Sequence, residues 1–270
     1  MKKLHYILLV VFTLSLQAQE DTTIKKGTLV ITTEVLFGKT FPSNYGFPET
    51  GVHKQLMLNI GKEYQNAPQQ WAQRFKGLQT GVGIGVSDFG QLELLGVAIT
   101  AIPYIEFNAF GSSRFKVLTA LGASYFTEKY DPIYNPNNRA VSTDITWAFR
   151  LFLYYKLLST KNVNWRLGLG FSHHSNGHTR LDNSGYNSIL MGVSGAIHAP
   201  FKNSTNIEGN TVNKPLYQKS KHGYIEFRTG HGWNVLAEAF NNIKPVYTIS
   251  GEYGYVLNSV FKIGLGAHYR

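Results

Sequence analysis

Cysteine is absent from the 270-residue sequence, and charged residues are scarce. Without cysteine the chain can form neither a disulfide framework nor a thiolate metal site, and no residue is present that could carry a lipoprotein anchor. Asp, Glu, Lys and Arg make up 16% of the sequence, whereas a soluble domain usually carries about 25%. The surface of this protein is therefore poor in charge.

Long hydrophobic runs are missing beyond the N-terminus, so no later stretch predicts a transmembrane helix. The N-terminus has the features of a secretory signal. Lys2 and Lys3 precede the apolar run Tyr6–Leu16, and Ala18 suits the last position before cleavage. The run is short for a membrane anchor, because a helix must cross about 30 Å of hydrocarbon. We predict a signal peptide over residues 1–18 and an exported mature chain.

What the sequence does contain is a two-residue alternation of apolar with small or polar side chains. The segment 144–156 is typical, since one face is wholly apolar from Ile145 to Tyr155 and the other carries Arg150 and Lys156. We count about eleven such segments of roughly 8–14 residues, separated by turns rich in Gly, Asn, Pro and Asp. This pattern predicts an all-β protein built from long antiparallel strands.

A soluble β-sandwich and a transmembrane barrel both fit such strands. Three features favour the barrel: the signal sequence, aromatic residues near many strand ends, as in the interfacial girdles of barrels, and alternating glycines such as Gly81, Gly83 and Gly85. We therefore predict an antiparallel transmembrane β-barrel of the bacterial outer membrane, spanning residues 19–270.

The expected number of strands is awkward, because bacterial barrels close with an even number. Either one of the eleven segments is not a barrel strand, or the last strand of the barrel lies beyond the sequence. The ending "GLGAHYR" has no terminal aromatic residue, which favours the second alternative.

The segment "WRLGLGFSHHSN" places polar residues at the end of one predicted strand. Its apolar stripe begins at Trp165 and continues through His173 and Ser175, whereas His174 and Asn176 belong to the opposite stripe. The side chains of His173 and Ser175 therefore project from the same outer surface. A hydroxyl beside an imidazole is the minimum requirement for an activated serine nucleophile.

The following predicted strand begins its own apolar stripe with Asn187. If the intervening loop closes a hairpin, Asn187 lies across from His173 on the same outer surface. An amide in that position can hold the imidazole in one tautomer, as the third member of a triad does. A catalytic Ser175–His173–Asn187 group on the outer wall of a barrel would serve a substrate that sits in the membrane.

The stretch "GFSHHSNG…DNSGYN" resembles the lipid A 3-O-deacylases of the PagL type and the broader acyloxyacyl-hydrolase-like outer-membrane proteins. The family pattern is His-x-Ser-Asn followed by Asn-x-Gly, represented here by His173, Ser175 and Asn176 and then by Asn183 and Gly185. The resemblance extends over roughly residues 81–187.

This resemblance implies an esterase that removes an acyl chain from lipid A at the membrane surface. It implies Ser175 as the nucleophile, His173 as the base, and backbone amides around Asn176 and Gly177 as oxyanion donors. Serine esterase chemistry requires no cofactor, and we expect none. Lipid A, or lipopolysaccharide, is the implied substrate.

The sequence departs from the family at Asn187, where the family has a glutamate by spacing. Asparagine can orient the imidazole but cannot stabilise an imidazolium by charge. Asp182 is a candidate replacement for the missing acid. His178 is bulky for a loop that presents backbone amides.

Three other interpretations remain open for these residues. The stretch "SHHSNGH" could be an ordinary polar loop at a barrel rim. A zinc site of His173, His174 and His178 is disfavoured, because adjacent histidines of a strand face opposite ways. The whole chain could also be a non-catalytic structural or pore-forming barrel, although the large side chains Leu118 and Phe152 on the inward stripe favour a filled interior.

The net charge is +10, and lipopolysaccharide phosphates are a better anionic partner for an exported barrel than nucleic acid. Arg114, Lys116, Lys161 and Arg180 are predicted to lie near strand ends, where they could contact these phosphates.

Overall fold

The computed structural model describes residues 28–64, 75–160, 163–199, 221–235, 242–257 and 261–270. These residues form eleven β-strands and one short helix. The predicted signal peptide, residues 1–18, lies outside the described residues.

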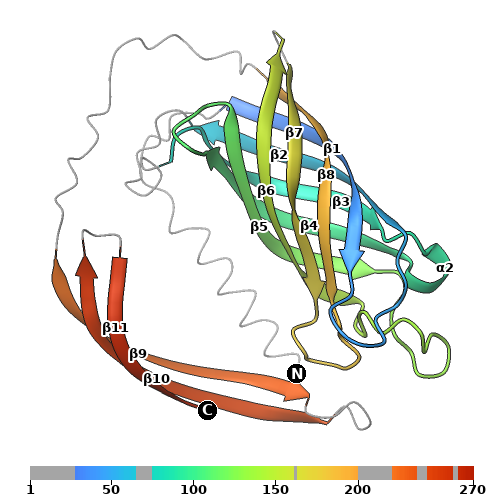
Figure 1. Ribbon diagram of the computed structural model, residues 1–270, viewed down its shortest axis with the longest axis vertical. Helices are drawn as coiled ribbons and strands as arrows, with labels where there is room; N and C mark the ends of the chain where they lie inside the picture. Colours follow the sequence, from blue (N-terminus) through green and yellow to red (C-terminus); the bar gives the residue numbers. More distant parts are fainter. Residues whose placement is uncertain (1–27, 65–74, 161–162, 200–220, 236–241, 258–260) are drawn as a thin grey trace, which may run out of the picture.

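The first eight strands follow one another around a closed sheet (Figure 1). Their bounds are β1 Thr28–Phe41, β2 Val52–Tyr64, β3 Leu78–Asp88, β4 Val97–Asn108, β5 Phe115–Phe126, β6 Ile145–Ser159, β7 Val163–Ser175 and β8 Tyr186–Ala199, with the helix α2 Leu92–Leu95 between β3 and β4. Each strand pairs antiparallel with its neighbours, and β1 pairs with β8 from Leu29↔Ala199 to Phe41↔Asn187. This last pairing leaves the sheet without a free edge, as a barrel requires.

The last three strands, β9 His222–Val235, β10 Ile243–Leu257 and β11 Phe261–Tyr269, form a separate sheet in the order β11-β10-β9. This differs from the single barrel reaching residue 270 that we expected. The physical reason is that β8 meets the free edge of β1, so the barrel closes with the even number eight. Strand alternation predicted about eleven strands, but it carries no information about which strand edges pair.

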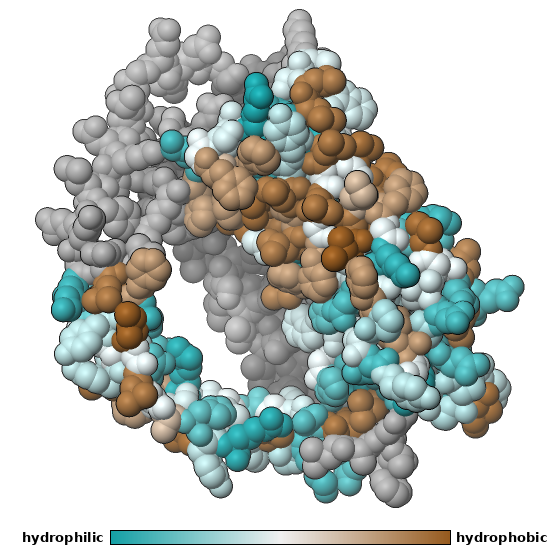
Figure 2. Space-filling model, in the orientation of Figure 1, coloured by the Kyte–Doolittle hydropathy of each residue, from teal (hydrophilic) through white to brown (hydrophobic). Residues whose placement is uncertain are grey.

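The outer face of the barrel is mostly apolar, as predicted. In β3 the side chains of Val82, Ile84 and Val86 are about half exposed, whereas the alternate residues Gly83 and Gly85 are buried. Figure 2 shows brown apolar side chains gathered over the barrel wall, with teal polar side chains around the loops. This band is what lipid-facing strands of an outer-membrane barrel require, and the fold is a transmembrane β-barrel of that class.

No helix in the described ranges is long and apolar enough to cross a membrane.

The lumen is filled by side chains. Phe152 and Tyr154 of β6 lie opposite Gly170 and Gly168 of β7, and a Cβ added at Gly168 would lie only 2.7 Å from the Tyr154 ring. Glycine on this inward stripe therefore leaves the space that the aromatic rings occupy. A filled lumen argues against an open pore.

Charged residues in the lumen are paired with one another. Glu34 is 1% exposed and accepts hydrogen bonds from Arg150 Nη2 at 2.8 Å, Tyr154 Oη at 2.8 Å and Asn59 Nδ2 at 2.7 Å. Further along the lumen Arg166 contacts both carboxylate oxygens of Glu106, at 3.0 and 2.9 Å. Ions buried in a low-dielectric interior require such partners.

Replacing Glu34 with alanine should destabilise the barrel strongly, because Arg150 would be left buried without its carboxylate. Removing one partner of a buried ion pair typically costs about 3–5 kcal/mol. The measurement is the free energy of unfolding in urea, in detergent or bilayers. Glu93→Ala, at an exposed site in α2, is the matched control and should change stability by less than about 0.5 kcal/mol; equal effects in both variants would contradict the pairing.

Candidate functional site

The candidate site lies where β7 ends and β8 begins. The connection between them, residues 176–185, contacts the long β5–β6 connection, residues 127–144. For example, the Gly185 amide donates to the Ala140 carbonyl at 2.8 Å, and the Ser184 amide donates to the Arg139 carbonyl at 3.2 Å. Two connections thus hold the end of the β7–β8 hairpin in place.

His173 and Asn187 are direct cross-strand neighbours in the β7–β8 pairing. His173 Nδ1 lies 2.7 Å from Asn187 Oδ1. Since an amide oxygen only accepts hydrogen bonds, the proton must be on Nδ1. The other ring nitrogen, Nε2, then carries the lone pair. The predicted partnership of these two residues is present, and it fixes the tautomer that a general base needs.

Ser175 lies two residues from His173 on the same outward stripe, and both side chains are half-buried. Ser175 Oγ accepts one hydrogen bond from the Gly177 amide at 3.1 Å and another from Asn183 Nδ2 at 2.9 Å. With both lone pairs engaged, the hydroxyl hydrogen is the remaining group that Ser175 can offer to a base.

Gly185 lies between the imidazole and the hydroxyl. A Cβ built on Gly185 would be 3.5 Å from His173 Cε1 and 3.5 Å from Ser175 Cβ. The imidazole edge and the serine side chain therefore border the same small space. Gly185 has a φ of 70°, a backbone conformation that glycine adopts readily, so a larger residue here would be strained and would crowd both side chains.

The two amides expected to hold an oxyanion are not equivalent. The Asn176 amide donates to Asn183 Oδ1 at 3.0 Å, so it is already occupied. The Gly177 amide points at Ser175 Oγ, and Asn183 supplies the second donor through its side chain. The donors that converge beside the serine are therefore Gly177 and Asn183, which differs from the expected pair, Asn176 and Gly177.

Asp182 does not occupy the position of a third triad member. Its carboxylate accepts from Arg139 Nε at 2.7 Å and from Arg139 Nη2 at 3.4 Å. The side chain of Asp182 is 7% exposed, so this ion pair joins the two connections at the site. Asp182 therefore links the β5–β6 connection to the β7–β8 connection. The expectation that it replaces the family's glutamate as the acid of the triad is wrong.

Directly behind the site, on the inner face of the wall, aromatic side chains form a plug. Tyr186 stacks on Phe89 with ring centroids 4.0 Å apart and on Phe126 at 5.3 Å, and His174 meets Phe126 edge-on at 5.6 Å. Since Tyr186 and His174 alternate with Asn187 and His173, the plug fixes the backbone that carries the outward pair. The inward orientation predicted for His174 is confirmed, because it is 1% exposed.

The outward surroundings of the pair are apolar. Trp147 of β6 pairs with Ser175, and Phe149 pairs with His173. Phe171 stacks against His173 with ring centroids 6.3 Å apart, and Trp147 and Ile189 are exposed. The hydroxyl and the imidazole are thus bordered by lipid-facing side chains.

His178 has a φ of 60° next to Gly177 at 67°, so the loop turns through two left-handed residues. Its carbonyl accepts from the Val235 amide of β9 at 3.3 Å. In the described part of the chain, no group of three or more His, Cys, Asp or Glu side chains could hold a metal ion.

The basic residues proposed for phosphate contacts are divided between the two ends of the barrel. Arg180 is exposed in the loop at the site. Lys116 instead points into the lumen, where it pairs with Glu63 at 3.1 Å and Glu106 at 3.4 Å, and Arg114 lies with it at the end opposite the site. Lys161 lies outside the described residues.

The sequence did not predict the roles of two residues, one at the candidate site and one in the lumen. Asn183 was noted only as part of a pattern, yet its side chain bridges Ser175 and the Asn176 amide. Glu34 was not singled out, because a single acid on an inward stripe gives no sign of its partners.

Comparison with models of protein families gives a match to one family. The family described as lipid A 3-O-deacylase (PagL) matches residues 34–195. This range contains the six complete strands β2 to β7 and most of β1 and β8, and it includes every residue of the candidate site. No curated protein matches the chain.

Among solved structures, the chain is similar to Neisserial surface protein A, with 9% identity, a TM-score of 0.40, and coverage of 63% of this chain and 97% of that one. It is similar to the Yersinia pestis outer membrane protein Ail at 11% identity and a TM-score of 0.37, covering 64% and 100%. It also resembles OprG from Pseudomonas aeruginosa at 14% identity and a TM-score of 0.33, covering 65% and 98%.

A double-mutant cycle separates the two roles considered for Asp182. If Asp182 acts through Arg139, Asp182→Asn should lower the free energy of unfolding in the wild-type background and have a smaller effect beside Arg139→Gln. The expected coupling is about 0.5–1 kcal/mol, since Arg139 is partly exposed. Additive effects of the two substitutions would contradict the tie between the connections.

Proposed function

Because the chain belongs to the lipid A 3-O-deacylase (PagL) family, we propose that Ser175 and His173 hydrolyse an ester-linked acyl chain of lipid A from the lipid-facing wall of this barrel. The observation that carries the proposal is the contact between His173 Nδ1 and Asn187 Oδ1 at 2.7 Å. It leaves Nε2 as a base on the same face as Ser175.

The orientation of the barrel supports this substrate. The connections at the site end, residues 42–51, 89–96, 127–144 and 176–185, average about 11 residues, whereas 65–77, 109–114 and 160–162 at the other end average about 7. Outer-membrane barrels carry their longer loops on the extracellular side. The site then faces the outer leaflet, which is where lipid A resides.

The reaction follows the logic of a serine hydrolase. Ser175 Oγ attacks the ester carbonyl carbon while its proton passes to His173 Nε2. The two donors that hold Oγ in the free protein, the Gly177 amide and Asn183 Nδ2, are positioned to transfer to the oxyanion that develops beside it. His173 then returns the proton to the leaving sugar oxygen, and water hydrolyses the acyl-serine to release a fatty acid.

Asn187 orients the imidazole without charge. Its oxygen accepts the Nδ1 proton, as asparagine does in Cys–His–Asn enzymes. A carboxylate would also stabilise the imidazolium that forms during attack, because hydrogen bonds to an ionised partner are roughly twice as strong. We therefore propose a working but slow triad.

A non-catalytic barrel is the second candidate, and one observation favours it. The third group is a neutral asparagine, and the nearby acid, Asp182, is bonded to Arg139. In this case the barrel would keep the geometry of the family without its chemistry.

Mass spectrometry of lipid A from cells that produce this chain distinguishes the two candidates. The deacylase predicts the loss of one hydroxyacyl chain, which disappears in cells producing Ser175→Ala. Ser172→Ala, on the inward face of the same strand, is the matched control and should retain the loss. If cells that produce correctly folded wild-type protein have unaltered lipid A, the deacylase is contradicted and the non-catalytic barrel is supported.

Substitution of Asn187 tests the account of the slow triad. Asn187→Glu should raise the turnover number by roughly tenfold or more, because the carboxylate adds charge stabilisation worth about 1.4 kcal/mol or more in the transition state. Asn187→Ala should lower turnover, since the imidazole loses its orienting partner. The measurement is kcat on purified lipid A in mixed micelles. If glutamate and alanine lowered turnover equally, Asn187 would have another role.

A further inference from the structure

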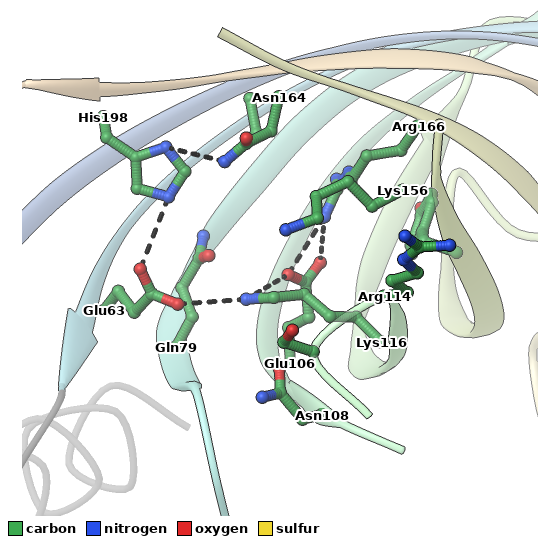
Figure 3. Close-up of a pocket in the computed structure, with 13 residues that line it drawn as sticks. Glu63, Gln79, Glu106, Asn108, Arg114, Lys116, Lys156, Asn164, Arg166 and His198 are labelled. Carbon is green, nitrogen blue, oxygen red and sulfur yellow. Dashed lines mark hydrogen bonds and ion pairs between the residues drawn. The ribbon is translucent and has the colours of Figure 1, made fainter. Parts of the chain in front are cut away.

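The end of the lumen opposite the candidate site contains a charged cavity of about 160 Å³. Its lining includes Arg114, Lys116, Lys156 and Arg166 together with the carboxylates of Glu63 and Glu106 (Figure 3). Four cations and two carboxylates leave an excess of two positive charges. The cavity is far from the ester site, since eleven residue steps of about 3.3 Å separate Asn164 at the cavity from Ser175, or roughly 35 Å along β7.

Ion pairs account for two of these four cations, Lys116 and Arg166, and for Arg150 further along the lumen. Glu34 pairs with Arg150, Glu106 pairs with Arg166, and Lys116 bridges Glu63 and Glu106. Three carboxylates and three strong cations therefore neutralise one another. His198 adds a further contact to Glu63 at 3.3 Å. This network requires nothing from Arg114 or Lys156.

Arg114 and Lys156 are the two cations of the cavity that this network leaves without a carboxylate partner. Neither side chain has a carboxylate partner among the residues that the structure describes. The two residues are also held side by side, because the Lys156 amide donates to the Arg114 carbonyl at 2.8 Å where β5 meets β6. Arg114 directly precedes β5 and lies across from Lys156 of β6, and like charges that face each other in this way repel. An anion between them would relieve the repulsion.

The other lining groups suit the oxygens of a phosphate. Ser113 and Asn164 lie at the same cavity and can donate hydrogen bonds. Asn108 Oδ1 is buried without a donor in the described structure, and a protonated phosphate oxygen could supply one. A phosphate carries between one and two negative charges at neutral pH, which matches the excess of two positive charges, and the planar guanidinium of Arg114 can contact two of its oxygens.

We propose that this cavity is a binding site for a phosphate group, held between Arg114 and Lys156. Both a free phosphate and the phosphate of a phospholipid headgroup in the adjacent leaflet carry this chemistry. The site is separate from ester hydrolysis, so its loss should leave the processing of lipid A unchanged.

The test uses the whole chain in a non-ionic detergent. Isothermal titration with inorganic phosphate should give saturable binding that weakens at high salt. Arg114→Gln and Lys156→Gln should each weaken the affinity by about tenfold or more, the effect of one lost charge-assisted contact. Lys39→Gln, which removes an exposed charge at the other end of the barrel, is the control and should bind as the wild type does.

A second arm identifies the source of the phosphate. The chain is taken from nanodiscs that contain phosphatidylglycerol and examined by native mass spectrometry. A retained phospholipid that is lost in both Arg114→Gln and Lys156→Gln would support the site with a headgroup as its ligand, even if free phosphate does not bind. Phosphate binding without a retained lipid would support a soluble ligand. If neither ligand binds, or if the two variants bind as Lys39→Gln does, the proposal is overturned.

Discussion

Side chains of a β-strand alternate between its two faces, and in a closed barrel one face meets lipid while the other meets the lumen. The pairing of β1 with β8 makes this division complete for all eight barrel strands. It forces residues 173, 175 and 187 onto the lipid-facing wall and residues 174 and 186 into the lumen. The location of the candidate chemistry therefore follows from strand parity together with barrel closure.

The same division explains why side chains in the lumen are joined by so many ion pairs and hydrogen bonds. A lumen filled with side chains has little water, so each carboxylate in it needs a cationic partner. Glu34 and Glu106 find theirs in Arg150 and Arg166, and the aromatic plug around Tyr186 closes the lumen behind the site. The wall that carries His173 is thus supported from inside by packing and ion pairs, which is how a rigid site is held on strands.

The sequence predicted the strands and the outward pair well, because both depend on a short-range signal with a period of two. Asn187 could be placed opposite His173 from the hairpin alone. Interactions set by loop geometry could not be predicted. Asp182, a candidate replacement for the family's acid, pairs with Arg139 instead, and Asn183 occupies the Asn176 amide that was expected to serve as an oxyanion donor.

The sequence pattern also could not predict which strand is the last one in the barrel. Strands β9, β10 and β11 have the same alternation as β1 to β8, yet they form their own sheet. Alternation reports that a strand has an apolar and a polar face, but closure depends on which two edges meet. Lys116 illustrates the same limit, since a lysine near a strand end was expected at the surface and instead joins Glu63 and Glu106 in the lumen.

The central claim is that the hydroxyl and imidazole act on a substrate held in the membrane. Surface-dilution kinetics test it most directly: lipid A hydrolysis is measured in mixed micelles while the substrate's mole fraction in the micelle and its bulk concentration are varied separately. The account predicts that the rate follows the mole fraction at the surface. A rate that follows bulk concentration alone, or equally fast cleavage of a soluble short-chain ester, would contradict it.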